Sequence, residues 1–149
     1  MRVLLDTNIL ARAAGGPPGP AHELYLRLTR REHVLLLSSF LIGELGRVLR
    51  YDRVRPIHGF SDSEIDQFLS DLGLIGEMVD VEAVPPAIVV ADPLDDPIVH
   101  ATVAGKADVL CTLDRHLLQP AVSAYCGLRG VRVITDVELL ALLRATTAP

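Results

Sequence analysis

Short runs that are apolar at every position recur along the chain and alternate with longer segments of helical periodicity. A strand that is apolar on both faces is typical of a parallel sheet covered by helices. Strands that alternate with helices form right-handed βαβ units. The sequence therefore predicts an α/β fold, a three-layer αβα arrangement around a parallel sheet. The expected strands are Arg2–Asp6, His33–Leu37, Met78–Ala83, Asp108–Thr112 and Val131–Ile134.

Cap residues and apolar spacing place helices between these strands. A capping box, in which a Ser or Thr and a Glu three residues later bond each other's backbone, is expected at Ser61–Glu64 and at Thr135–Glu138. The expected helices are Ala21–Arg31, a segment capped by Ser38-Ser39, a segment after Ser61, Asp96–Ala104 closed by Gly105, and a segment after Thr135. A short extended segment is expected at Ile88–Val90.

The composition favours one domain over residues 1–149, because half of the residues are hydrophobic and the mean hydropathy is +0.36. No apolar run approaches the roughly 20 residues of a membrane span, and no signal peptide precedes the first strand, so a cytoplasmic protein without a membrane partner is expected. Cys111 and Cys126 are expected to be reduced core thiols. The net charge of −5 argues against a passive nucleic-acid binder but is compatible with an enzyme that holds cations.

Carboxylates follow the predicted strands where such sheets bind ligands, outside the carboxyl ends of the strands. They are Asp6, Glu44, Asp95, Asp96 and Asp114. Each alone has a structural explanation, as a helix cap, a turn residue or a solvated side chain. Together on one partly buried edge they would repel one another unless a cation neutralised them, and Arg115 is the one basic residue within these motifs.

Oxygen ligands of this kind favour a hard divalent ion, Mg²⁺ or Mn²⁺. Such an ion can lower the pKa of a bound water, polarise a phosphoryl oxygen and neutralise the charge that develops in phosphodiester cleavage. The acidic edge therefore indicates a hydrolytic phosphoesterase.

Four segments follow one another in a specific order and spacing. They are Leu5-Asp-Thr-Asn8, Ser38-Ser-Phe-Leu-Ile-Gly-Glu-Leu45, Asp92-Pro-Leu-Asp-Asp96 running into Ala101, and Ala107-Asp-Val-Leu-Cys-Thr-Leu-Asp-Arg-His-Leu-Leu118. Together they resemble the PIN domain, and most of all its toxin-component branch. That branch is related to the VapC-type ribonuclease toxins of prokaryotic toxin–antitoxin pairs.

The resemblance implies a five-stranded sheet of order 3-2-1-4-5 and a metal-dependent endoribonuclease that uses Mg²⁺ or Mn²⁺. It also implies an RNA substrate, a small antitoxin protein as partner, and a homodimer. Carried over by position, the catalytic and metal-binding acids are Asp6, Glu44, Asp96 and Asp114, with Asn8 and Thr112 as supporting polar groups. A housekeeping RNA-processing nuclease and a non-cleaving scaffold for RNA or a partner stay open as alternatives. A receiver-like signalling module is disfavoured because no lysine lies in Val131–Asp136.

Two positions depart from the family pattern. Leu113 stands where relatives often have Gly, and His116 stands where many have a further Asp. His116 is expected either to contact a phosphate or to face solvent, and His100 either to lie near the metal or to be a satisfied interior histidine. The remaining acids are expected to be structural, Asp92 and Asp95 as loop and cap groups and Asp108 as the cap of a strand entry.

Arginines are densest at the end of the predicted helix that carries Glu44 and in the connector beyond it. A helix end favours cations, so a solvated role is one explanation, and a patch that follows RNA phosphates is the other. The chain has no Trp and few other aromatic residues, so base stacking is not expected to dominate recognition. The candidate RNA contacts are Arg47, Arg50, Arg53, Arg55, Arg115 and His116.

Overall fold

Five parallel strands make up the sheet in the computed structural model of the chain, which describes residues 1–15, 17–81 and 95–146. The strands are β1 Arg2–Leu5, β2 Val34–Leu37, β3 Glu77–Met78, β4 Val109–Cys111 and β5 Arg132–Ile134. They pair in the order β3-β2-β1-β4-β5, which confirms the predicted fold and strand order. The order of connection reverses beside β1, and such a reversal places a ligand crevice at the carboxyl ends of the neighbouring strands.

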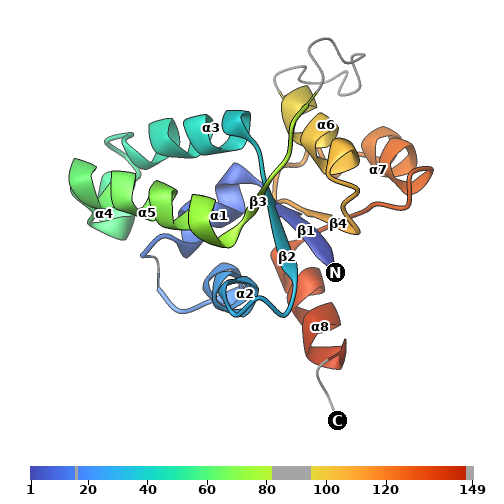
Figure 1. The fold of residues 1–149 in the computed structure, drawn as a ribbon, viewed down its shortest axis with the longest axis horizontal. Coiled ribbons are helices and arrows are strands. Elements are labelled where there is room, and N and C mark those ends of the chain that lie inside the picture. Colours follow the sequence, from blue (N-terminus) through green and yellow to red (C-terminus); the bar gives the residue numbers. More distant parts are fainter. Residues whose placement is uncertain (16, 82–94, 147–149) are drawn as a thin grey trace.

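The helices cover both faces of this sheet. They are α1 Thr7–Ala13, α2 Pro20–Thr29, α3 Ser39–Leu49, α4 Arg55–His58, α5 Asp62–Ile75, α6 Asp96–Ala104, α7 Pro120–Gly127 and α8 Asp136–Thr146. Figure 1 shows α1, α2 and α5 on one side of the strands and α6 and α7 on the other, with α8 beside α2. The helix α3 contacts α1 and α5 and also reaches α6, so it lies close to the carboxyl edge of the sheet.

The central strand is buried on both faces, as its uniformly apolar sequence predicts. Val3 pairs with Leu35 of β2 on one side and with Val109 of β4 on the other, and all three side chains are buried. Both cysteines are free and buried, as expected, and burial raises the pKa of each thiol. Among the described residues, no helix has the length and apolar character to cross a bilayer.

The predicted caps are confirmed at several helix starts. Ser61 and Glu64 form the expected capping box of α5. The backbone N–H and the hydroxyl of Thr135 both donate to the Glu138 carboxylate, each over 2.8 Å, at the start of α8. The Ser38 hydroxyl accepts from the Leu41 N–H at the start of α3. Helix α6 spans Asp96–Ala104, the predicted range.

Other elements differ from the sequence prediction. Helices α1, α4 and α7 were not predicted; they have seven, four and eight residues, too few for a clear helical period. The third strand, expected over Met78–Ala83, begins one residue earlier and ends at Met78, because only Glu77 and Met78 pair with the last two residues of β2; residues 79–81 are not in a strand. Residues 82 and 83 and the segment expected at Ile88–Val90 lie outside the described residues.

Candidate metal centre

Asp6 lies at the centre of the carboxyl edge, directly after β1. Its backbone N–H donates to the Cys111 carbonyl at the end of β4, over 2.9 Å, so the turn that carries Asp6 is fixed between the two central strands. One oxygen of its carboxylate accepts from the Thr7 N–H over 2.7 Å and thereby caps α1. The residue is only 6 % exposed. A buried carboxylate that caps a helix and follows a central strand can hardly change its position.

The other oxygen of Asp6 is held by the two residues predicted as supporting polar groups. The Thr112 hydroxyl donates to it over 2.7 Å and the Asn8 amide over 3.2 Å. The Thr112 hydroxyl also accepts from the Asp114 N–H over 2.9 Å, and the Asn8 carbonyl oxygen accepts from the Leu113 N–H over 3.3 Å. These bonds tie the loop after β4 to the end of β1, so the predicted acids Asp6 and Asp114 belong to one hydrogen-bonded unit.

Glu44 reaches the same unit from α3 through a residue that the sequence analysis did not single out. The Thr7 hydroxyl donates to the Glu44 carboxylate over 2.5 Å, while the Thr7 backbone N–H holds Asp6. The sequence signal for Thr7 was its place after Asp6 at a helix start. That signal predicts a backbone contact with the cap and does not predict a partner 37 residues away.

The electrostatics of Asp6 reflect this crowding. Its pKa is raised to about 6, chiefly by burial; the hydrogen bonds from Thr112 and Thr7 oppose this rise, and the nearby charges of Glu44 and Asp114 add to it. Three carboxylates therefore interact electrostatically at one edge of the sheet. None of the groups that hydrogen-bond to Asp6 and Glu44 here is a cation. The donor set, which consists of carboxylate oxygens held by hydroxyl and amide donors, fits a hard divalent cation.

A second group of potential ligands adjoins the first. The Nδ1 atom of His116 lies 3.8 Å from the Asp114 carboxylate and 3.9 Å from that of Asp95, and the His116 N–H donates to Asp114 over 2.8 Å. Asp95 occupies the N-cap position of α6, as expected, but its side chain caps none of the N–H groups there. Among the described residues, Asp95, Asp114 and His116 are the one set of three potential ligands whose atoms all lie within 4.8 Å of one another.

The fourth predicted acid, Asp96, is buried at the first position of α6, on the same edge of the sheet. Among the described residues, no three of the four predicted acids bring ligand atoms within 4.8 Å of one another. His100, one turn further along α6, is buried. Asp108 accepts from the Arg2 N–H over 2.7 Å at the entry to β4, the structural role expected for it. Asp92 lies outside the described residues.

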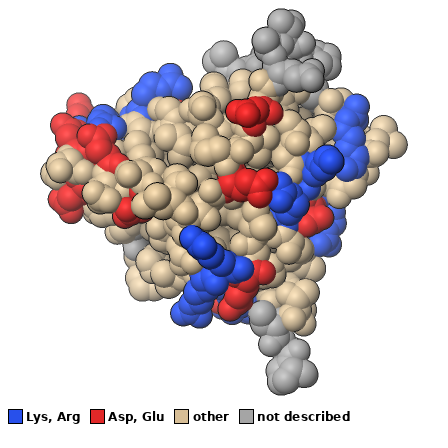
Figure 2. Space-filling model, viewed as in Figure 1, with Lys and Arg blue, Asp and Glu red and all other residues tan. Residues whose placement is uncertain are grey.

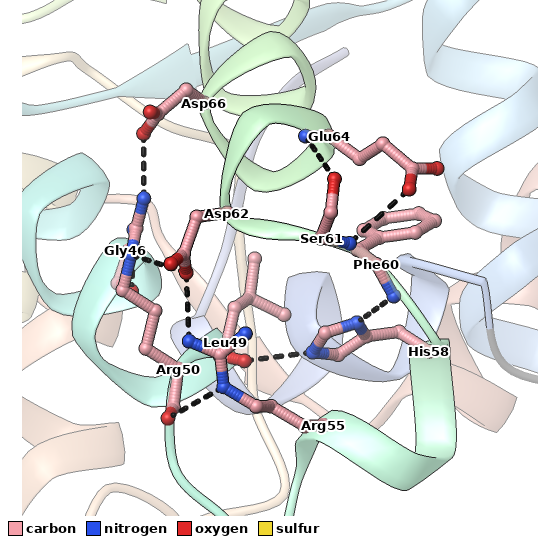
Figure 3. Close-up of polar contacts among 10 residues, drawn as sticks. All are labelled: Gly46, Leu49, Arg50, Arg55, His58, Phe60, Ser61, Asp62, Glu64 and Asp66. Carbon is pink, nitrogen blue, oxygen red and sulfur yellow. Dashed lines mark hydrogen bonds and ion pairs between the residues drawn. The ribbon is translucent and has the colours of Figure 1, made fainter.

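Two of the predicted RNA-contacting arginines have acidic partners within the protein. Arg50 donates to Asp66 over 2.7 Å and lies 3.4 Å from Asp62 (Figure 3). Arg55 also donates to Asp62, over 2.7 Å, and with Arg50 it lowers the pKa of that carboxyl. In Figure 2, acidic side chains gather at the left of the molecule, over α4 and α5, with basic ones next to them. These contacts connect the end of α3 to α5 and give Arg50 and Arg55 a structural role.

The other candidate contacts have different surroundings. Arg47, Arg53 and Arg115 are exposed, and the Arg53 guanidinium lies 5.5 Å from the centre of the Tyr51 ring. The half-exposed His116 faces carboxylates, as described above. A role of these residues in RNA binding stays a prediction.

The chain is similar to known proteins in sequence and in fold. A family model described as "PIN domain" matches residues 2–116. The protein PAE2754 of Pyrobaculum aerophilum superposes with a TM-score of 0.58 at 19 % identity, over 97 % of this chain and 90 % of that one. VapBC2 of Rickettsia felis, in a structure described as bound to a DNA fragment from their promoter, superposes with a TM-score of 0.56 at 15 % identity, over 91 % and 98 %. The search of curated proteins found no match.

Proposed function

Because the chain belongs to the PIN domain family, we propose that it is a metal-dependent endoribonuclease that hydrolyses RNA phosphodiester bonds. The observation that carries the proposal is the buried carboxylate of Asp6, which two threonines join by hydrogen bonds to Glu44 and to the backbone of Asp114. A structural role alone does not account for three interacting acids on one edge, because their mutual repulsion opposes folding.

Four acids would hold the ion, Mg²⁺ or Mn²⁺: Asp6, Glu44, Asp96 and Asp114. When bound, the ion supplies a water of lowered pKa and a positive charge for the phosphoryl oxygens. The protein's own groups keep the acids in place beforehand. The hydroxyls of Thr7 and Thr112 and the amide of Asn8 donate to carboxylate oxygens, so the acids stay oriented in spite of their repulsion.

RNA would lie along the carboxyl edge of the sheet beside the acids, with the exposed Arg47, Arg53 and Arg115 and the half-exposed His116 as candidate contacts for its phosphates. Because the net charge of the protein is −5, the molecule as a whole does not attract RNA. Only a local basic surface can attract the phosphate backbone of the RNA. Sequence preference would then depend on loops around the edge.

We further propose that the enzyme is the toxin of a type II toxin–antitoxin pair, with a small antitoxin protein as partner and a homodimer as its assembly. The similarity in fold to VapBC2 supports this assignment, since the name denotes a complex. A housekeeping RNA-processing nuclease of the same family is the alternative. The two are separated by expressing the chain alone and then together with the product of the adjacent gene: a toxin arrests growth, and its antitoxin restores growth and copurifies with the chain.

Cleavage is tested with purified protein and single-stranded or looped RNA, with Mg²⁺ or Mn²⁺ and then with a chelator. We expect cuts that depend on the ion and that are lost in Asp6→Asn and in Glu44→Gln. The matched control is Asp71→Asn, which removes an exposed acid of α5 and should cleave normally. Cleavage at an unchanged rate in the chelator, or in both site variants, would contradict the proposal.

A further inference from the structure

The position of His116 places a nitrogen ligand among carboxylates at the edge of the site. Its Nδ1 atom lies 3.8 Å from a carboxylate oxygen of Asp114 and 3.9 Å from one of Asp95. Both distances exceed that of a hydrogen bond. Two ligands that each lie about 2.1 Å from one ion are separated by roughly 3 Å when adjacent and by up to about 4.2 Å when opposite. The separations of His116 from the two carboxylates are therefore those of ligands that share one ion, and all three ligand atoms lie within 4.8 Å of one another.

The accessibility of these side chains also suits an ion that keeps some of its water. The side chains of His116, Asp114 and Asp95 are 36 %, 34 % and 21 % exposed. They come from two segments, the start of α6 and the loop after β4, so the site is set by the fold and not by one stretch of sequence. The His116 N–H that donates to Asp114 turns the chain back, so the ring lies beside that carboxylate.

An imidazole changes which ion a carboxylate site prefers. Mg²⁺ takes oxygen ligands almost alone, whereas first-row transition ions accept nitrogen readily. We propose that Asp95, Asp114 and His116 bind a transition ion through the His116 imidazole, so that this chain selects Mn²⁺ over Mg²⁺. The inference rests on the proposed function, in which Asp114 already contributes to the metal site. It adds two ligands, Asp95 and His116, and a metal preference.

The test compares wild type with His116→Asp, which makes every ligand an oxygen, and with His116→Gln, which removes the ligand nitrogen. His22→Gln on α2 is the matched control for loss of a histidine elsewhere. Titration calorimetry gives Kd for Mg²⁺ and for Mn²⁺, and pulsed electron paramagnetic resonance of bound Mn²⁺ detects coupling to a ligand ¹⁴N nucleus. We expect the ratio of the Mg²⁺ Kd to the Mn²⁺ Kd to be at least about tenfold larger in wild type than in His116→Asp. The ¹⁴N coupling should be present in wild type and His22→Gln and absent from both His116 variants.

Each other outcome has a definite meaning. An equal ratio of the two Kd values in wild type and His116→Asp, or wild-type Mn²⁺ without imidazole ¹⁴N coupling, overturns the inference and leaves the proposed nuclease intact. If Mn²⁺ is bound through His116 but RNA is not cleaved, the inference stands and the proposed function fails. If wild type binds neither ion, both fail.

Discussion

Two threonines organise the acidic site at the level of single residues. Thr7 donates its backbone N–H to Asp6 and its hydroxyl to Glu44, and Thr112 donates to Asp6 while it accepts from the Asp114 N–H. A hydroxyl can donate and accept at once, and for this reason Thr112 can connect two acidic residues that repel each other. The acids are therefore oriented by hydrogen bonds within the protein before any ion binds.

The role of the Thr7 hydroxyl is tested with Thr7→Val, which keeps the shape of the buried side chain and removes the donor to Glu44. We expect the affinity for Mn²⁺, measured by calorimetry, to fall by roughly tenfold because Glu44 loses its orientation. Thr7→Ser restores the hydroxyl and should bind Mn²⁺ as wild type does. Equal affinity in Thr7→Val and wild type would show that the contact with Glu44 plays no part in the metal site.

The raised pKa of Asp6 predicts how stability depends on pH. The pKa of this carboxyl is 3.8 in an unfolded chain and about 6 in the folded protein, so the folded state binds more protons between these values. The contribution of Asp6 to the free energy of unfolding is therefore greatest at low pH, falls as the pH rises above about 4, and is lowest above about 6. Between low pH and pH values above about 6, the contribution of Asp6 to the free energy of unfolding falls by about 3 kcal/mol in all.

Asp6→Asn removes this titration. We expect the free energy of unfolding of wild type, relative to Asp6→Asn, to fall by up to about 3 kcal/mol between pH 4 and pH 7 in chelator. Denaturant titrations at several pH values measure the difference, in which the contributions of the other acids cancel. Parallel pH profiles for the two proteins would mean that Asp6 titrates normally and is not crowded by Glu44 and Asp114.

The sequence predicted the positions of the acids at the carboxyl edge better than the contacts between them. Asp6 and Asp114 could be located because each follows an apolar run that can only be a buried strand, and Glu44 because it lies on the helix after another. The neighbours of His116 could not be predicted, since its approach to Asp95 depends on how α6 packs beside the loop after β4. Local sequence determines where a side chain leaves the backbone, and packing determines what it meets.

At the level of elements, the corner formed by α3, α4 and α5 is held by polar contacts. Arg50 and Arg55 connect the end of α3 and the start of α4 to acids of α5. The buried ring of His58 accepts from the Phe60 N–H over 2.8 Å and lies 2.7 Å from the Leu49 carbonyl, so it joins the ends of α3 and α4 (Figure 3). This corner keeps α3, and with it Glu44, in place beside β1.

Two pairs of arginines should therefore differ in their effects. Arg50→Ala with Arg55→Ala should lower the melting temperature at low salt, with a deficit that narrows in 1 M salt as screening weakens the ion pairs. Arg47→Ala with Arg53→Ala should leave the melting temperature nearly unchanged. That second pair should instead reduce the salt slope of single-stranded RNA binding by about 1.4, if each side chain contacts one phosphate. Melting curves and RNA binding at several salt concentrations measure both effects.

The opposite result is equally informative. A salt slope that falls only in the variant lacking Arg50 and Arg55 would mean that these residues leave their acidic partners to bind RNA. A slope unchanged in both double variants would remove this face of the molecule from the RNA-binding surface.

The capping box of α5 gives a second test at this level. Ser61→Ala removes the hydroxyl that accepts from the Glu64 N–H and should lower the free energy of unfolding by about 1 kcal/mol. Ser63→Ala, two residues along the same exposed turn, is the control and should change stability little. Equal effects of the two changes in denaturant titrations would mean that the cap does not contribute to stability.

Elements with strong end signals were predicted closely, and short ones were missed. The helix α5 was found because a capping box marks the start of its apolar run. The helix α6 was found because Asp96 and Gly105 mark the two ends of its apolar run. The helix α7 lacks a side-chain cap and α4 has only one turn, so neither shows a pattern that differs from a loop. The start of β3 depends on which of its residues pair with the end of β2. This pairing is a property of the sheet and cannot be predicted from the sequence of the strand alone.

At the level of the whole molecule, the parallel sheet brings together acids that are far apart in the chain. Asp6 and Thr112, whose side chains are hydrogen-bonded, are separated by 106 residues. A site assembled in this way does not exist in the unfolded chain, so an ion that binds it binds the folded state alone. Metal binding must then raise the stability of the entire domain, whatever the reaction that the site performs.

This linkage distinguishes a metal site from a set of helix caps, and Asp96 at the start of α6 is the residue on which to test it. An ion at 100 times its Kd stabilises the folded state by about 2.7 kcal/mol, and melting curves of wild type with Mn²⁺ and with chelator measure that increment. Asp96→Asn should keep the stability of the chelated protein, because Asn has almost the same shape as Asp and carries no charge to repel the other acids of this edge. The same change should also reduce the stabilisation of the folded state by Mn²⁺ and abolish RNA cleavage. The control Asp71→Asn, at an exposed acid of α5, should keep both, and an Asp96→Asn protein that also keeps both would show that Asp96 lies outside the metal site.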